Sequence, residues 1–196
     1  SMKNRSILIL GARSDIGIAV AHRFAKEGFN IQLAGRNAKT LKSECEDIVL
    51  RYDVVVSYHE FDILDIASHE NFVKDLPYLP EIVINSIGLL GKQKEYEIDN
   101  EKVSLVINTN YLGPLSIFGI FANYFERRGH GTLIGISSVA GDRGRQSNYI
   151  YGSSKAGFSS FLSGLRNRLH SKNIKVLTVK PGYVRTKMTR GLNLPS

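Results

Sequence analysis

Residues 6–17 read SILILGARSDIG, and this stretch decides the fold. Its first half, Ser6 to Leu10, is a short apolar run without polar alternation, which is typical of a strand buried on both faces in a parallel sheet. From Ile16 to Lys26, apolar and small residues recur at helical spacing, and Gly28 follows as a stop signal. The stretch therefore predicts a strand, a glycine-bearing turn and a helix, in that order.

The same alternation of apolar runs and helical patterns continues along the chain. Further strands are predicted at residues 30–34, 54–58, 82–85, 131–137 and 175–178. Helices are predicted at 38–52, 66–74 and 149–170, with a long helix inside 100–125. Strands joined through helices form βαβ units, and their crossovers are right-handed almost without exception. The pattern predicts an α/β fold, a doubly wound parallel sheet with helices on both faces.

Length and composition fit a single globular domain. The chain has 196 residues, of which 42% are hydrophobic and 22% charged, and no linker or repeat divides it, so we expect one domain over residues 1–196. These values exclude a disordered, collagen-like or coiled-coil chain. No apolar run reaches the roughly 18 residues of a membrane span, and no signal peptide precedes the first strand. The one cysteine, Cys45, excludes a disulfide framework. A cytoplasmic location is predicted.

Positive charge is concentrated in the last third of the chain. The net charge is +8, and residues 126–196 hold 13 Lys or Arg against two Asp or Glu. Such a region favours an anionic ligand, an acidic partner or contact with a membrane surface, such as the inner face of the cell membrane. A solvated basic face explains the same count equally well. Nucleic-acid binding is not expected, because no aromatic-interleaved basic groove or nucleic-acid motif accompanies the charge.

The turn after the first strand is suited to a dinucleotide. Its glycines let backbone N–H groups approach a pyrophosphate, and the helix N-terminus adds its partial positive charge. The alternative is a tight turn without a ligand, in which Ser14 or Asp15 only caps the helix. The residues expected to contact the cofactor here are Gly11, Arg13, Ser14, Asp15, Ile16 and Gly17.

The end of the second predicted strand indicates which dinucleotide binds. An acidic side chain at this position bonds the ribose hydroxyls of NAD, whereas an arginine accommodates the 2′-phosphate of NADP. The chain has Arg36 there, with Arg13 in the glycine turn as a second cation. The sequence therefore predicts NADP rather than NAD, unless Arg36 is an ordinary surface arginine. Asp62, after the third strand, is expected to accept from the adenine amino group or to shape a turn.

The strongest candidate for catalysis combines Ser138 with Tyr151 and Lys155. Tyrosine and lysine four residues apart on a helix point the same way, with about 5–6 Å between their Cβ atoms. A nearby ammonium favours phenolate over phenol, so this tyrosine can donate a proton to a developing alkoxide or remove one from an alcohol. Ser138 follows the fifth predicted strand, at the edge where open α/β sheets bind ligands. Tyr149, six residues from Lys155, lies off that helical face.

No metal site is expected. The histidines fall on different predicted elements, and none pairs at the spacing of metal ligands. They are His22, His59, His69, His130 and His170.

These motifs resemble those of the short-chain dehydrogenase/reductase family. The resemblance runs from the first strand to Pro181-Gly182 and includes the glycine turn, 85–88 (NSIG), 110–113 (NYLG), 136–138 (ISS) and 181–186 (PGYVRT). It implies a Rossmann fold and an NAD(P)-dependent oxidoreductase. In the implied mechanism a tyrosine is the acid/base, a lysine binds the nicotinamide ribose and tunes the tyrosine, a serine polarises the carbonyl, and an asparagine holds a water in the proton relay. The resemblance assigns these roles to Tyr151, Lys155, Ser138 and Asn110.

The resemblance also implies cofactor contacts outside the glycine turn. It places Asn85 and Gly88 beside the adenosine half of the cofactor. Leu10, Asp15 and Ser86 depart from the family, which has Thr, Gly and Asn at these positions. Asp tolerates left-handed backbone better than most residues, so we expect the turn to survive, with the charge of Asp15 directed away from the pyrophosphate or capping the helix. Further contacts are implied at Tyr151, Lys155, Pro181, Gly182, Val184 and Thr186, the last to the carboxamide.

A narrower resemblance suggests a substrate. Residues 14–17, 88–91 and 137–151 are similar to the 2-reductases that act on decaprenylphosphoryl keto-pentoses. That likeness implies reduction of a ketone in a polyprenyl-phosphate keto-sugar, a lipid-linked carbonyl compound. Arg143 and Arg145 would then lie near the substrate phosphate, or else in a solvated loop. A 3-oxoacyl group on an acidic carrier protein is the alternative substrate, and a non-catalytic NADP-binding regulatory protein is the alternative function.

Two further expectations concern assembly and the end of the chain. The helices at 100–125 and 149–170 carry phenylalanines that suggest more apolar surface than one sheet face needs, so we expect a homodimer or homotetramer that pairs these helices, as family members commonly do. The substrate lid of the family follows Pro181-Gly182, so we expect the final strand and the lid beyond residue 196. The phenylalanines are Phe118, Phe121, Phe158 and Phe161.

Overall fold

The strand, turn and helix predicted near the N-terminus form as β1 (Ser6–Leu10) and α1 (Asp15–Lys26) in a computed structural model, which describes residues 5–181 of the chain. All five residues of β1 are buried, because this strand lies in the middle of the sheet. Ser14 begins the helix. Its Oγ accepts the backbone N–H of Gly17 at 2.9 Å, which satisfies one of the N–H groups that the start of a helix leaves unpaired.

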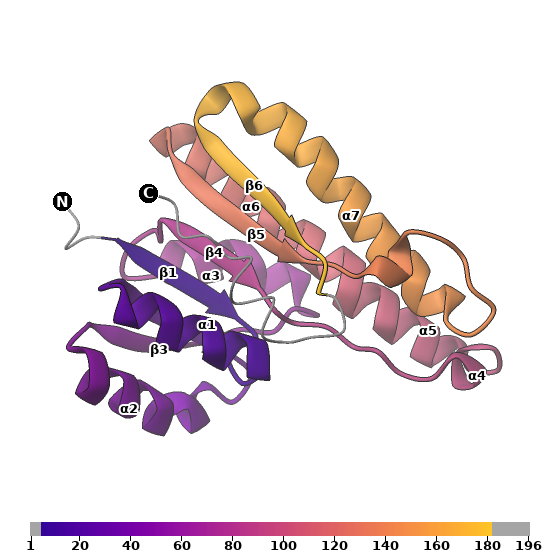
Figure 1. The fold of residues 1–196 in the computed structure, drawn as a ribbon, viewed down its shortest axis with the longest axis horizontal. Coiled ribbons are helices and arrows are strands. Elements are labelled where there is room, and N and C mark those ends of the chain that lie inside the picture. The colour runs from indigo at the N-terminus through magenta and orange to yellow at the C-terminus, as the bar shows by residue number, and fades with distance from the viewer. Residues whose placement is uncertain (1–4, 182–196) are drawn as a thin grey trace.

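Six parallel strands form one sheet in the order β3-β2-β1-β4-β5-β6 (Figure 1). The strand order reverses between β1 and β4, and ligands of open α/β sheets bind outside the carboxyl ends of the strands at such a switch point. The predicted doubly wound parallel sheet is therefore confirmed. The strands after β1 are β2 (Asn30–Gly35), β3 (Val56–Glu60), β4 (Ile82–Asn85), β5 (Gly131–Ile136) and β6 (Ile174–Val179).

Helices cover both faces of the sheet, each face over its own core. Successive side chains of a strand point to opposite faces, so β1 contributes Ile7 and Ile9 to the core under α1 and α2, and Leu8 and Leu10 to the core under α3, α6 and α7. The helices after α1 are α2 (Lys42–Tyr52), α3 (His69–Asp75), α4 (Gln93–Tyr96), α5 (Asn100–Ile107), α6 (Gly113–Arg128) and α7 (Tyr149–Leu169). Short 3-10 helices are η2 (Ala38–Leu41), η3 (Ile66–Ser68), η5 (Val139–Gly141) and η6 (His170–Lys172), and η4 (Asn108–Leu112) is a π-helix.

The structure departs most from the predicted elements in three places. β3 begins two residues later than predicted, since Asp53 takes a left-handed conformation (φ 54°) at the end of α2 and pairing with β2 starts only at Val56. Helix α4 was not predicted, because four residues are too few to show a helical period. The helix expected inside 100–125 consists of α5, η4 and α6 in direct succession.

The apolar surface expected to mediate assembly lies largely inside the protein. Phe118, Phe121 and Phe158 are 0% exposed, and Phe161 is partly exposed. The expectation that these rings leave surplus apolar surface is wrong, because α6 and α7 both use them to pack on one face of the sheet. The helical stretch Asn100–Arg128 is long and apolar enough to cross a membrane by length and composition, but half of its apolar window is buried. Core packing accounts for that apolar character.

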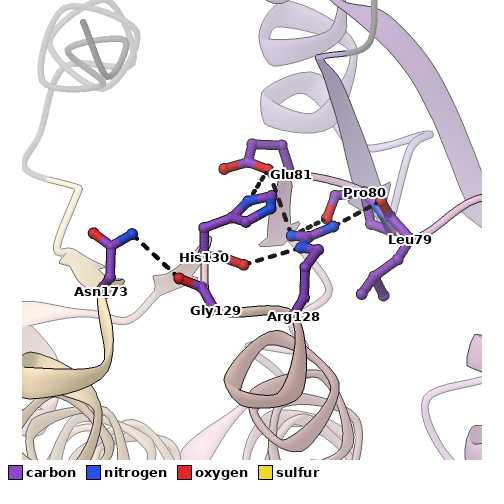
Figure 2. A network of polar contacts seen from close by, with 7 residues as sticks. All are labelled: Leu79, Pro80, Glu81, Arg128, Gly129, His130 and Asn173. Carbon is purple, nitrogen blue, oxygen red and sulfur yellow. Dashed lines mark hydrogen bonds and ion pairs between the residues drawn. The ribbon is translucent and has the colours of Figure 1, made fainter.

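Arg128 connects two segments at the edge of the sheet where the strands begin (Figure 2). Its guanidinium donates to three backbone carbonyls, those of Leu79 at 3.0 Å, Pro80 at 2.9 Å and His130 at 3.1 Å. Glu81 joins the network, with its Oε2 2.8 Å from Nδ1 of His130 and 3.5 Å from Nη2 of Arg128. These contacts connect the loop before β4 to the turn between α6 and β5, and they lie at the edge opposite the carboxyl ends of the strands.

Candidate functional site

A pocket of about 510 Å³ lies at the carboxyl ends of the strands, beside the switch point between β1 and β4. Segments that follow four different strands meet there, because the parallel arrangement brings all carboxyl ends to one edge. The pocket is lined by residues 11–14, 35–36, 61–64, 86–89, 105 and 109. Of the predicted cofactor contacts, this brings together Gly11, Arg13, Ser14, Arg36, Asp62 and Gly88.

The glycine turn needs its two glycines. Gly11 has φ +86°, and a Cβ there would lie 2.8 Å from the side chains of Ile87 and Ser86, on the pocket side of the turn. A Cβ at Gly17 would lie 2.5 Å from the carbonyl oxygen of Gly11, so this glycine lets α1 approach the turn closely. The turn thus presents backbone and the start of α1 to the pocket, an arrangement that fits a pyrophosphate.

Two residues of this region differ from those that the family resemblance implies, and each has a local explanation. The Ser86 hydroxyl donates to the carbonyl of Leu10 at 2.8 Å and fastens the end of β4 to the turn. Asp15 is the first residue of α1 and is exposed, a position where the helix dipole favours a negative side chain. Ile16 packs against the core under α1. The capping alternative therefore holds for Ser14, which also lines the pocket.

Arg13 is fixed to the loop that follows β2. Its Nε donates to Oγ1 of Thr40 at 3.0 Å and its Nη2 to the carbonyl of Asn37 at 2.6 Å. Arg36 begins the same loop and lines the pocket. Asp62 forms a turn, since its Oδ1 accepts the N–H of Leu64 at 2.9 Å, and it lines the pocket as well. The two predicted cations thus both line the pocket, where they favour an anionic group on a ligand.

The remaining predicted contacts fall into three groups. Asn85 is 2% exposed and accepts the N–H of Ile87 at 3.1 Å, so it braces the end of β4 and does not line the pocket. Pro181 follows β6 and is partly exposed. The other three lie outside the described residues, namely Gly182, Val184 and Thr186.

Asn110 lies at the π-helical step between α5 and α6. A π-turn inside a helix redirects side chains and is frequent at functional sites. Here it brings the fully buried Asn110 against the loop after β4: Oδ1 accepts the N–H of Leu89 at 2.8 Å, and Nδ2 donates to the carbonyl of Leu89 at 2.8 Å. Nδ2 also lies 3.1 Å from Oγ of Ser154 on α7. Asn110 therefore joins the pocket loop to the helix that carries Tyr151 and Lys155.

Lys155 is buried at the end of β5. Lys155 is only 5% exposed, and its Nζ donates to the carbonyl of Ile136 at 3.1 Å. Burial disfavours the charged ammonium and lowers the pKa of Lys155 from 10.5 to about 8. Tyr151, one turn earlier on α7, is partly exposed. The pair thus combines a buried amine with a partly exposed tyrosine.

Ser138 is held against α7 by two glycines. Its Oγ accepts the N–H of Ala140 at 3.1 Å, which starts η5. A Cβ at Gly152 would lie 2.5 Å from the carbonyl oxygen of Ala140, and a Cβ at Gly141 would lie 2.6 Å from the N–H of Ala156. Only glycines permit this close approach, so the segment that follows Ser138 packs on the turn of α7 that bears Tyr151 and Lys155.

Replacing Gly152 by alanine should therefore destabilise the protein. The new Cβ would force the backbone of η5 away from α7, and we expect the free energy of unfolding to fall by about 1–3 kcal/mol. Gly164→Ala on the same helix is the matched control. Its Cβ meets nothing within 4 Å, so this variant should gain about 0.5–1 kcal/mol from helix propensity. Urea unfolding of both variants measures the difference. An equal increase in the free energy of unfolding for both would show that η5 does not pack tightly on α7.

Sequence reasoning missed the residues that position α7. The Ser154 hydroxyl donates to the carbonyl of Tyr151 at 2.6 Å and contacts Asn110. Gln93, on the unpredicted α4, accepts the N–H of Ile150 in the first turn of α7 at 3.1 Å. The serine stands between Tyr151 and Lys155 and could have been noticed there. Gln93 carries no such signal, because its partner lies 57 residues along the chain.

One histidine forms a cluster that the sequence did not indicate. Nε2 of His22 lies 2.7 Å from Oε1 of Glu44, and ligand-type atoms of His22, Glu44 and Asp47 lie within 4.8 Å of one another. These residues belong to α1 and α2. None of them lines the pocket beside the glycine turn.

Comparisons with known proteins agree with this fold. The short chain dehydrogenase family matches residues 5–195. An uncharacterized oxidoreductase of Mycobacterium tuberculosis is 35% identical over 95% of this chain and 76% of the relative. A 3-oxoacyl-[acyl-carrier-protein] reductase of Chlamydia muridarum is 28% identical over 97% of this chain and 78% of the relative. The structure of a short-chain dehydrogenase from Sphingobium yanoikuyae in complex with NADPH superposes with a TM-score of 0.84 at 26% identity, over 98% of this chain and 78% of that one.

Proposed function

The chain belongs to the short chain dehydrogenase family and is an NAD(P)-dependent oxidoreductase, and from this premise we propose that it interconverts a ketone and an alcohol with NADP(H) as the cofactor. The observation that carries the proposal is the pair on α7, in which the buried Lys155 lies one turn from the partly exposed Tyr151. Asn110 and Ser138 are joined to the same helix. A protein that only bound the cofactor would not need this combination.

In the proposed mechanism the bound cofactor supplies the hydride, and the chain supplies a proton and orientation. Tyr151 donates its proton to the substrate oxygen as negative charge develops there, and takes it back during alcohol oxidation. The Ser138 hydroxyl donates a hydrogen bond to the same oxygen and stabilises that charge. The Lys155 ammonium would hold the nicotinamide ribose beside Tyr151. Asn110 fixes the loop at Leu89 and connects it to α7.

We expect NADPH to bind more tightly than NADH. Arg36 and the anchored Arg13 both flank the pocket beside β2, and one charge-assisted contact to the 2′-phosphate supplies about 1.5–3 kcal/mol, or about 10-fold to 150-fold in affinity. Fluorescence titration with each reduced cofactor measures the two dissociation constants. Arg36→Asp should reverse the preference, because a carboxylate repels the phosphate and bonds the ribose hydroxyls. Equal constants for the wild-type protein would contradict the assignment.

The proposed substrate is a small-molecule or lipid-linked carbonyl compound. A polyprenyl-phosphate keto-sugar is supported by Arg143 and Arg145, which are exposed in the loop that leads to Tyr151, where they could meet an anionic group. A 3-oxoacyl group on a carrier protein is the second candidate, favoured by the similarity to the chlamydial 3-oxoacyl-[acyl-carrier-protein] reductase.

A panel of carbonyl compounds tests the proposed function. Oxidation of NADPH is followed with a polyprenyl-phosphate keto-sugar, a 3-oxoacyl thioester on its carrier protein and simple ketones. Turnover of the first supports the lipid-linked substrate, and turnover of the second supports the carrier-protein substrate. Cofactor binding without turnover of any of them would favour the alternative function, that of a non-catalytic regulatory protein.

We further propose a homo-oligomer that pairs the α6 and α7 helices of two chains. Because Phe118, Phe121 and Phe158 are buried in the core, the proposal is supported instead by apolar side chains that remain at least partly exposed on η4, α6 and α7. They are Leu112, Leu115, Ile120 and Phe161.

A further inference from the structure

We propose that Glu60 is a specificity-determining residue, whose carboxylate opposes the 2′-phosphate of NADP and narrows the preference for this cofactor over NAD. The inference rests on the proposed function in one respect, that the adenosine ribose is bound at the end of β2. A sequence rule for cofactor choice examines the residue after the second strand, which is Arg36. Glu60 comes from the third strand, so that rule does not include it.

The pairing of β2 with β3 places Glu60 beside the end of β2, which Arg36 follows. Gly35, the last residue of β2, is paired with Glu60, the last residue of β3. Parallel strands end at the same edge of the sheet, so the side chain of Glu60 reaches the loop that begins with Arg36. A residue 24 positions further along the chain thus lies beside the residue on which the choice between NAD and NADP depends.

The Glu60 carboxylate is bound by the backbone of that loop. Oε1 accepts the N–H of Asn37 at 3.0 Å, and Oε2 accepts the N–H of Ala38 at 2.7 Å. Asn37 is in the left-handed conformation (φ 52°), and successive N–H groups converge on an anion in such a turn. The side chain is therefore held against the loop at its charged end, although Glu60 is an exposed residue.

The loop then carries charges of both signs at the place where a phosphate would bind. Arg13 donates to the carbonyl of Asn37, the same residue whose N–H binds Glu60, and Arg36 precedes it in the chain. Within the described part of the chain, Glu60 has no ion pair with either arginine, so its charge is not neutralised by contact. A 2′-phosphate attracted by the arginines is repelled by this carboxylate. The uncharged ribose hydroxyls of NAD are not repelled.

Glu60→Gln tests this inference. The amide keeps the size of the side chain and one accepting oxygen but removes the charge. We expect the variant to bind NADPH about 10-fold more tightly, while the NADH dissociation constant changes by less than about 2-fold. Calorimetric titration with adenosine 2′,5′-bisphosphate and with AMP should show the same contrast without the nicotinamide. Glu27→Gln is the matched control. It removes one negative charge at the far end of α1, about 18 Å from the glycine turn, and should leave all four constants unchanged.

Two results would overturn the inference. An unchanged ratio of NADPH to NADH affinity in Glu60→Gln would show that the carboxylate does not oppose the phosphate. A parallel loss of affinity for both cofactors would show that Glu60 only shapes the loop. Neither result bears on catalysis, which the carbonyl panel tests separately. The adenosine bisphosphate titration reports on Glu60 even in a protein that turns over no ketone.

Discussion

Tyr151→Phe is expected to lower turnover by at least about 10²–10⁴-fold, the usual contribution of general acid–base catalysis. The substitution keeps the ring and its packing but removes the hydroxyl that donates the proton in the proposed mechanism. Cofactor affinity should change little, because in the proposed mechanism the phenol contacts the substrate oxygen rather than the adenosine half of the cofactor. Steady-state assays on the true substrate and fluorescence titration with NADPH measure the two quantities on the same preparation.

Tyr149→Phe provides the matched control for this experiment. Tyr149 is also on the first turn of α7 and is exposed, but it lies off the helical face that carries Lys155. It should keep near-wild-type turnover. If Tyr151→Phe also retained near-wild-type reductase activity, the acid/base role proposed for Tyr151 would be wrong and the reaction would need another proton donor.

Lys155→Met is expected to abolish most turnover while making the cofactor-free protein more stable. In the proposed mechanism the ammonium would hold the nicotinamide ribose beside Tyr151, so both kcat and NADPH affinity should fall. Burial of the same group destabilises its charged form and so costs folding free energy. The pKa of Lys155, lowered by burial from 10.5 to about 8, reports this cost. A shift of this size corresponds to a penalty of up to about 3 kcal/mol at pH 7, which methionine does not incur.

The pH dependence of stability distinguishes this penalty from simple repacking. Below pH 8 the lysine is charged in both the folded and the unfolded chain, so the full penalty is present. Between pH 8 and 10.5 the unfolded chain binds the proton more tightly, and the stability of the wild-type protein therefore rises relative to Lys155→Met. Urea unfolding of both proteins at pH 7 and pH 10.5 should show the advantage of the variant shrinking. An advantage that does not change with pH would contradict the lowered pKa.

The fold could be predicted from sequence because its signals are local. The run from Ser6 to Leu10 and the glycine turn each determine their own structure, and the alternation of strands and helices leaves few topologies. The limits of β3 depend on pairing with β2, which no local pattern reports. The burial of Phe118 and Phe158 also escaped prediction, because the area that one sheet face covers is a property of the assembled layers.

The residues of the candidate site likewise fall into those that a local sequence pattern predicts and those that depend on the tertiary fold. Tyr151 and Lys155 are found by their spacing on one helix, and Ser138 by its place after a strand. Gln93 and Glu60 contact their partners only through the tertiary fold, at separations of 57 and 22–23 residues. Neither is part of a sequence motif, so neither could be assigned a role before the strands and helices were placed.

The π-helical step at η4 has a consequence for how this scaffold can change during evolution or design. Each residue of an α-helix turns the chain by about 100°, so the loss of one residue from Asn108–Leu112 would rotate α5 relative to α6 by roughly that angle. Asn110 would leave Leu89, and either the core face of α6 or the outer face of α5 would point the wrong way. The number of residues in this step is therefore fixed, even where the side chains on either side of it can vary. Variants with an insertion or deletion there are expected to be eliminated, whereas variants with substitutions can persist.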